Sequence, residues 1–131
     1  MQRATKIRID LDSPVPAYRQ IVDALRVLLV EGALPPGASL PSVRRLAMDL
    51  GVHFNTVGEA YRELAAEGWL DLKQGRGATV IARGSQPAAA PERWQELRVQ
   101  LRNLVAQMRS AGVPPSRIAA ELRAITESLK P

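Results

Sequence analysis

A single glycine, Gly51, separates two short amphipathic patterns, and this arrangement limits the folds open to the chain. On both sides of it, apolar residues recur at the spacing of one helix face. The first pattern comprises Val43, Leu46, Ala47 and Leu50, and the second comprises Val57, Ala60, Tyr61 and Leu64. Because glycine commonly ends a helix in a sharp turn, we expect two helices that meet at Gly51, the second over residues 53–67. Ser42 is a suitable N-cap for the first.

The segments around this pair predict one more helix and a β-hairpin. Helical spacing over residues 16–31 predicts the helix, which Pro16 opens and Gly32 ends. Residues 34–38 carry two prolines and a glycine and predict a turn. After Gly68, residues 69–72 and 79–81 predict two short strands around the tight turn of residues 74–77. Helix, helix, glycine turn, helix and hairpin is the order of a winged helix-turn-helix, so the expected fold class is mainly α with a small β-hairpin.

The C-terminal part predicts a separate helical hairpin. Residues 83–91 have the composition of a linker, with small residues and two prolines. Two narrow apolar seams follow, which Gly112 and the two prolines after Val113 separate. Their residues are Trp94, Leu97, Leu101, Leu104, Met108, Ile118, Leu122 and Ile125. Two short helices cannot bury a sufficient core alone, so we expect this seam to form a dimer interface. The predicted domains are therefore residues 1–84, a linker of 85–91 and a dimerisation hairpin of 92–131.

Composition narrows the possible functions. The chain has no cysteine and one histidine, His53, so we expect no metal centre, no catalytic triad, no cofactor and no enzymatic activity. Its 18 basic residues against 13 acidic ones, a net charge of +5, favour an anionic partner such as nucleic acid. Met1–Asp12 has no hydrophobic stretch and no aliphatic run approaches the length of a membrane span. We therefore expect neither a secretory signal nor a membrane partner.

In a winged helix-turn-helix, the helix after the glycine turn enters the major groove of DNA. Its expected solvent face comprises His53, Phe54, Asn55, Thr56, Gly58, Glu59 and Arg62. Asn55 can pair with adenine, and Thr56 can contact a base or a phosphate. Arg62 is better placed for a phosphate. Arg44, near the start of the preceding helix, can read guanine or grip the backbone.

Several of these residues also have a simpler interpretation. His53 can be a turn residue or a weak cap, and Tyr61 and Trp69 are core residues rather than stacking platforms. Gly58 inside a helix costs about 1 kcal/mol relative to alanine, which indicates either a close approach to the backbone or plain tolerance. Arg76, between Gly75 and Gly77 at the hairpin tip, suits a narrow minor groove.

Five motifs give the chain a resemblance to the GntR family of bacterial transcription regulators. They are residues 32–47 (GALPPGASLPSVRRLA), 50–57 (LGVHFNTV), 61–64 (YREL), 67–70 (EGWL) and 74–80 (QGRGATV). The resemblance covers roughly residues 14–82 and keeps both identity and spacing. The short two-helix tail is similar to that of the YtrA subfamily, in which the tail serves dimerisation.

This resemblance implies a dimeric, sequence-specific repressor of the bacterial cytoplasm, with a reading helix at 53–67 and a wing at 72–83. It implies DNA contacts at the positions of Arg44, Asn55, Thr56, Gln74, Gly75 and Arg76, and we include Ser42 among the candidates. Many members have arginine where this chain has Phe54 and Gly58, so its operator is expected to differ. Phe54 can touch a thymine methyl group or pack on its own protein.

Two other functions remain open at this point. A small-molecule sensor would gate DNA binding by a ligand between linker and tail, although Arg98, Arg102, Glu121 and Arg123 are expected to be solvated. A non-specific architectural protein would bind operator and random duplex equally well.

Overall fold

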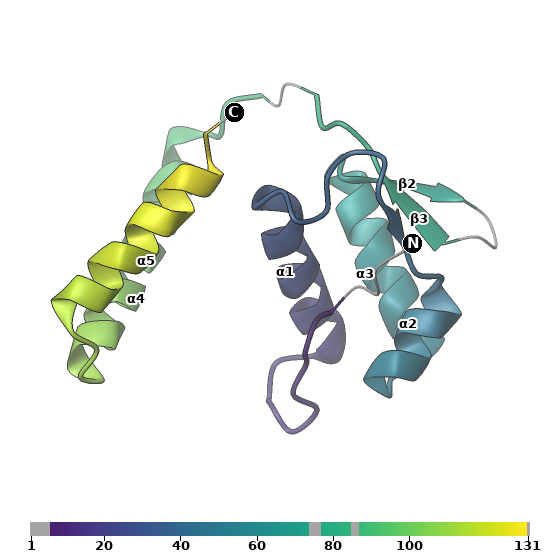
Figure 1. Cartoon of the computed structure of the whole chain (residues 1–131), viewed down its shortest axis with the longest axis horizontal. Coiled ribbons are helices and arrows are strands. Elements are labelled where there is room, and N and C mark those ends of the chain that lie inside the picture. Colours follow the sequence, from purple (N-terminus) through teal and green to yellow (C-terminus); the bar gives the residue numbers. More distant parts are fainter. Residues whose placement is uncertain (1–5, 74–76, 85–86, 131) are drawn as a thin grey trace. The chain divides into compact units, whose positions relative to one another are not determined.

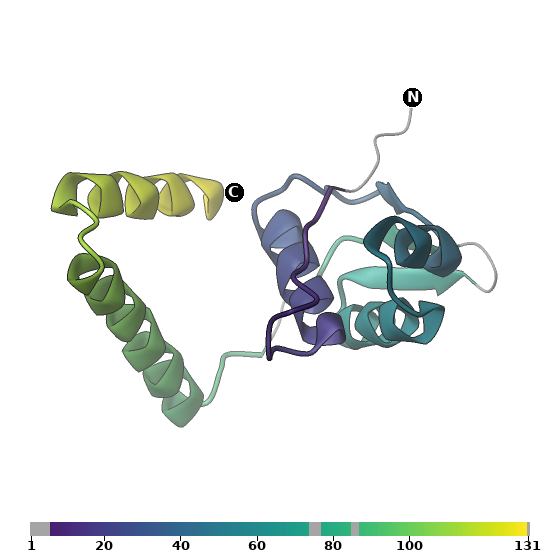
Figure 2. The same cartoon turned by 90° about the horizontal axis from the view of Figure 1, so that it is seen from below.

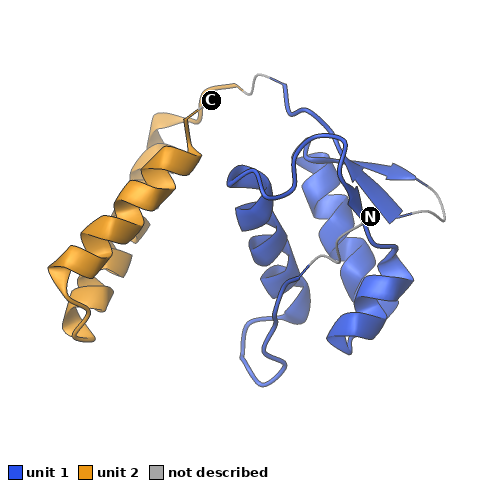
Figure 3. Cartoon of the chain, in the orientation of Figure 1, with its two compact units in different colours: residues 1–84 blue, residues 85–131 orange. Residues whose placement is uncertain are grey.

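A computed structural model describes residues 6–73, 77–84 and 87–130 and divides the chain into two compact units. Unit 1 is Met1–Gly84 and unit 2 is Ser85–Pro131 (Figure 3). Each unit is described by itself below. Unit 1 contains the helix-turn-helix and the sheet, and unit 2 contains two helices.

Unit 1 is built around its third helix. α1 (Ala17–Val30), α2 (Val43–Leu50) and α3 (Phe54–Ala66) lie side by side, and α3 stands in the middle, in contact with both others (Figure 1). The core comprises Ile21, Val22, Leu25, Leu29, Leu40, Leu46, Ala47, Val57, Ala60, Tyr61, Leu64, Leu70, Ala78 and Val80. The buried residues of α3 are therefore those that the sequence pattern predicts, which confirms a mainly α fold.

Side chains at the two helix starts explain why the helix-turn-helix begins where it does. The Ser42 hydroxyl accepts a hydrogen bond from the Arg45 amide at 3.1 Å, as a helix N-cap does. Gly51 ends α2 in the left-handed conformation with φ of 72°. His53 then caps α3, since its Nδ1 accepts a hydrogen bond from the Asn55 amide at 3.0 Å. The capping interpretation of His53 is thus correct.

The sheet has one strand more than the sequence predicts. β1 (Ser39–Leu40), β2 (Leu70–Lys73) and β3 (Gly77–Val80) form an antiparallel sheet in the order β1-β3-β2. The hairpin of β2 and β3 is confirmed, with its strands shifted by one or two residues from the expected ranges. β1 was missed because two residues before Pro41 are too few to show an alternating pattern.

Ion pairs hold α1 against α3. Arg19 Nη1 lies 2.9 Å from Glu63 Oε2, and Arg26 Nη2 lies 2.6 Å from Glu67 Oε2. The hydrogen bond from Arg26 lowers the pKa of the Glu67 carboxyl below its ordinary value. These arginines are occupied by intramolecular carboxylates on the side of α3 that faces α1.

Unit 2 consists of α4 (Pro91–Ser110) and α5 (Pro115–Ser128), which diverge from the turn between them (Figure 2). The seam residues Trp94, Leu97, Leu101 and Leu104 of α4 and Leu122 and Ile125 of α5 are exposed. Met108 is half-buried, and Ile118 is buried. The described helices include none long and apolar enough to cross a membrane.

Candidate nucleic-acid interface

The start of α3 presents the predicted reading residues to solvent. Asn55 is exposed and Thr56 is half-buried, while Val57 beside them is fully buried in the core. Capping by His53 fixes the backbone that carries these side chains. An exposed amide and a hydroxyl on a rigid helix end can donate to and accept from the edges of bases.

Three side chains at this end of α3 stack on one another. The ring centroids of His53 and Phe54 lie 4.4 Å apart at an interplanar angle of 26°. Arg44 Cζ, from the start of α2, lies 4.7 Å from the centroid of the Phe54 ring, which is a cation–π contact. Phe54 therefore contacts side chains of its own protein, and its predicted contact with a thymine methyl group stays a prediction.

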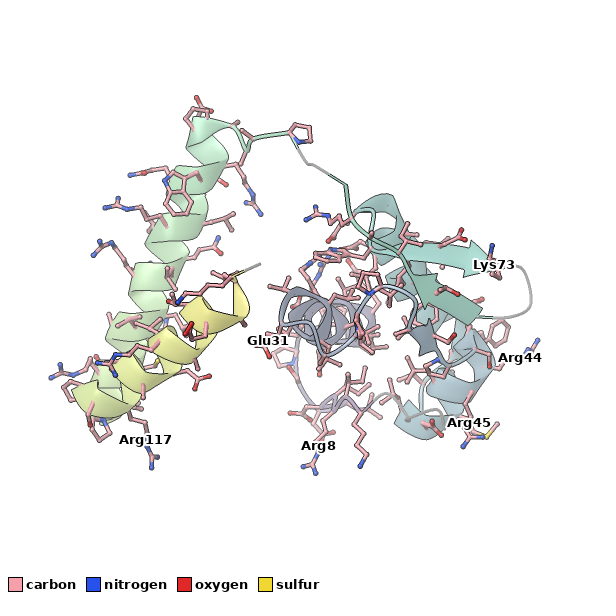
Figure 4. The ribbon with its side chains drawn as sticks, turned by 45° about the horizontal axis from the view of Figure 1, so that its top comes forward. Arg8, Glu31, Arg44, Arg45, Lys73 and Arg117 are labelled. Atoms are coloured by element: carbon pink, nitrogen blue, oxygen red, sulfur yellow. The ribbon has the colours of Figure 1, made fainter. Side chains whose placement is uncertain are left out.

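A groove of about 470 Å³ runs between the start of α2, the exposed side of α3 and the hairpin. Its described lining residues are Ser42, Val43, Arg44, Phe54, Gly58, Tyr61, Arg62, Leu72, Lys73 and Gly77. Three of them are basic and none is acidic. Figure 4 shows Arg44 on α2 and Lys73 on β2 pointing outward from the same side of unit 1. The groove thus has the charge that a phosphate backbone requires.

Gly58 leaves room for Arg62 within this groove. A Cβ atom at position 58 would lie 3.3 Å from Nη1 of Arg62, and it would meet nothing else so close. The guanidinium group therefore lies over the glycine, one helical turn before its own position. A glycine inside a helix can indicate that another group approaches its backbone closely. At Gly58, the close neighbour within the described residues is the Arg62 side chain of the same chain.

Tyr61 connects α3 to the segment before α2. Its hydroxyl donates a hydrogen bond to the Pro41 carbonyl oxygen at 2.8 Å, and burial raises the pKa of the phenol above its ordinary value near 10. Tyr61 is fully buried, as expected of a core residue. It was not predicted to line the groove, and neither were Val43, Leu72 and Lys73, because their position depends on how the hairpin packs against α2.

The hairpin supplies fewer free cations than its sequence suggests. Gln74, Gly75 and Arg76 lie outside the described residues, so their predicted contacts stay predictions. Lys73 Nζ lies 2.9 Å from Asp71 Oδ2. Arg83 is held at the base of the hairpin, where Nε donates to the Glu67 carbonyl oxygen at 2.9 Å and Cζ lies 4.7 Å from the Trp69 ring centroid.

Unit 2 has a groove of about 450 Å³. Trp94, Arg98, Leu101, Arg102, Val105 and Leu122 line it. Four of these six residues are apolar, and three belong to the predicted seam. The arrangement suits a protein surface that becomes covered, because exposed apolar patches of this kind mark interaction sites.

Carboxylates and His53 do not assemble a metal site in the part of the chain that the structure describes. Asp23, Glu63 and Glu67 come close to each other only around the two arginines of α1.

Comparison with known proteins agrees with this architecture. Residues 17–80 match the model of "Bacterial regulatory proteins, gntR family". The chain is 33% identical over 124 residues to the HTH-type transcriptional repressor YtrA of Bacillus subtilis (strain 168), an alignment that covers 95% of each protein. These similar proteins are transcription regulators and not enzymes.

Two solved structures are similar as well. YtrA from Sulfolobus acidocaldarius, described as a GntR-family transcription factor, shares 38% identity at a TM-score of 0.56 and covers 76% of this chain and 97% of its own. A protein described as a transcriptional antiterminator from Listeria monocytogenes EGD-e shares 25% identity at a TM-score of 0.65, covering 98% and 96%.

Proposed function

We propose that the chain acts as a homodimeric repressor at a pseudo-palindromic operator. The proposal starts from its family: the chain belongs to the gntR family of bacterial regulatory proteins and is thus a DNA-binding transcription regulator. DNA binding itself follows from the family. What we propose is the symmetry of the complex, the residues that read bases, and repression as opposed to activation. Repression is favoured because the similar protein of Bacillus subtilis bears the name of a repressor. Its place of action is the bacterial cytoplasm, where the operator DNA lies.

The observation that carries the proposal is the basic groove between α2, α3 and the hairpin. Arg44 and Arg62 line it, and neither forms a salt bridge with any residue that the structure describes. The arginines of α1, in contrast, are held by Glu63 and Glu67. Among the described residues, positive charge that no carboxylate of the chain neutralises therefore gathers on the side of unit 1 that would face a duplex.

Within this groove, α3 takes the role of the reading helix. Asn55 at its exposed start pairs with an adenine in the major groove, and Arg44 reads a guanine or holds the adjacent phosphate. Arg62, farther along α3, contacts the backbone. The hairpin of residues 72–83 lies beside the helix and enters the neighbouring minor groove.

The apolar seam of unit 2 provides the second half of the proposal. Leu101, Leu104 and Trp94 are all more than half exposed in the single chain. Fully burying an exposed leucine side chain contributes about 1.5–3 kcal/mol, so pairing the seams of two copies gains roughly half of this at each half-exposed leucine. The dimer then sets the distance between two reading helices, and hence between two half-sites.

Selection of bound duplexes from a random pool tests this function. The expected product is one motif repeated as two inverted half-sites at a fixed separation, because two identical reading helices are held by one dimer. The control pool uses a protein in which Asn55→Ala and Arg44→Ala are combined, and it should enrich the motif poorly. Recovery of unenriched sequences by the unmodified protein would instead indicate a non-specific architectural role.

A further inference from the structure

Phe54 is the exposed aromatic residue at the point where the reading helix would meet a base. Its side chain is 40% exposed and lies at the start of α3. We infer that Phe54 is a positioning residue: it holds the guanidinium group of Arg44 in place for base reading and does not read a base itself. This inference rests on the proposed function, since it assigns a part to one residue of that same surface.

The contact that carries the inference joins α2 to α3. Arg44 Cζ lies 4.7 Å from the centroid of the Phe54 ring. The neighbouring Arg45 behaves differently, because its Nε lies 3.4 Å from Asp49 Oδ1 on the same helix. Of the two adjacent arginines, only Arg44 takes the aromatic ring as its partner within the described chain. The ring itself stacks on His53, the residue that caps α3.

This chain of contacts restricts the rotamers of an exposed arginine side chain in the free protein. Arginine has about 2 kcal/mol of rotamer entropy to lose when it is held in one position. A contact with a ring that is anchored through His53 restricts the guanidinium before DNA arrives. Such a contact leaves most of the five N–H donors of the group available for a guanine edge. Preorganisation of this kind lowers the cost of binding.

The residue one helical turn after Phe54 leaves the Phe54 ring and the Arg44 guanidinium group accessible to a duplex. Gly58 follows Phe54 by one helical turn and brings no side chain into the groove that both residues line. Within the described residues, a Cβ atom at Gly58 would have one close side-chain neighbour, Nη1 of Arg62. The guanidinium group of Arg44 thus lies at Phe54. That of Arg62 lies at Gly58, one helical turn farther along α3.

A direct contact of Phe54 with a thymine methyl group is the competing role, and a double-mutant cycle separates the two. The variants are Arg44→Ala, Phe54→Leu and the combination of both. Fluorescence anisotropy measures their affinity for a duplex selected by the unmodified protein and for every single base-pair variant of it. Leucine keeps an apolar side chain of similar size but removes the ring, whereas Phe54→Tyr keeps the ring.

We expect Phe54→Leu to weaken binding about two- to fivefold, the range of an exposed cation–π contact. Its loss of base preference falls on the same base pair as that of Arg44→Ala. The double variant binds no more weakly than Arg44→Ala alone, and Phe54→Tyr restores both affinity and preference. Thermal unfolding of the Leu variant stays close to that of the unmodified protein, because the side chain is half exposed.

Losses that simply add in the double variant would overturn the inference, as would a Phe54→Leu effect at a different base pair. Both results would assign the ring to DNA directly. Unchanged binding by Arg44→Ala would overturn it as well, since nothing would then remain to be positioned. An unmodified protein without any base preference would refute the proposed function itself, and the cycle would show this before any variant is compared.

Discussion

Gly77 is the position at which one added methyl group tests how closely the hairpin packs against α2. The residue begins β3 with φ of +82°, and a Cβ atom there would lie 3.0 Å from the Pro41 carbonyl oxygen and 3.1 Å from Ser42 Cα. Both neighbours are backbone atoms and cannot rotate away. Gly77→Ala therefore forces the hairpin away from the start of α2.

The magnitude follows from two contributions. An L-residue at this φ costs about 1–2 kcal/mol of backbone strain. Overpacking against fixed atoms adds about 1–3 kcal/mol, so Gly77→Ala should lower the free energy of unfolding by about 2–5 kcal/mol. Gly32 provides a matched control, because it has the same φ of +82° and nothing lies within 4 Å of its Cβ position. Gly32→Ala should cost only the strain, about 1–2 kcal/mol.

Urea denaturation of the two variants measures the difference directly. The larger loss in Gly77→Ala should be accompanied by weaker operator binding, since Gly77 also lines the basic groove. Gly32→Ala, folded at the assay temperature, should bind as the unmodified protein does. Equal destabilisation by the two substitutions would refute the argument, because it would show that no backbone atoms stand close to the hairpin at position 77.

Four further substitutions test other parts of the account. Tyr61→Phe should cost about 0.5–1.5 kcal/mol of unfolding free energy, since the part-buried hydrogen bond to the Pro41 carbonyl oxygen is lost. Because burial raises the pKa of Tyr61, stability should fall more steeply in the parent than in the variant as the pH rises above about 10. Glu67→Gln should make the free energy of unfolding depend less on pH in the acid range. The hydrogen bond from Arg26 lowers the pKa of Glu67, so the stability that this carboxylate contributes is present above the ordinary carboxyl pKa and is lost as the pH falls. Asn55→Ala should weaken operator binding by about 1–3 kcal/mol and relax preference at one base pair, and an unchanged preference profile in competition assays would remove it from the reading residues. Leu101→Asp should convert the dimer to a monomer in analytical ultracentrifugation, whereas an intact dimer would assign the interface elsewhere.

The sequence predicts the helices of unit 1 well because their burial depends on local periodicity. All four expected inward residues of α3 are buried, and Ser42 and Gly51 define the ends of α2 as their chemistry demands. β1 escaped prediction for the opposite reason. Its two residues form a strand only because β3 supplies the hydrogen-bond partners from a distant part of the chain.

The sequence nominates single candidate residues for the site, but it does not predict how they are arranged. Asn55 and Arg44 follow from the position of a reading helix after a glycine turn. The contact between Arg44 and Phe54 depends on how α2 crosses α3, which no sequence pattern records. Arg83 shows the same limit, since its contacts with the Trp69 ring and the Glu67 carbonyl oxygen depend on how the hairpin packs against the end of α3.

Amide chemical shifts during titration with a selected duplex show which face of unit 1 binds DNA. We expect the largest changes at the described residues that line the basic groove, which are Ser42, Val43, Arg44, Phe54, Gly58, Tyr61, Arg62, Leu72, Lys73 and Gly77. Amides on the side of α1 that pairs with Glu63 and Glu67 should change little. Large shifts confined to α1 or to unit 2, with the groove unaffected, would contradict the assignment of this face to DNA.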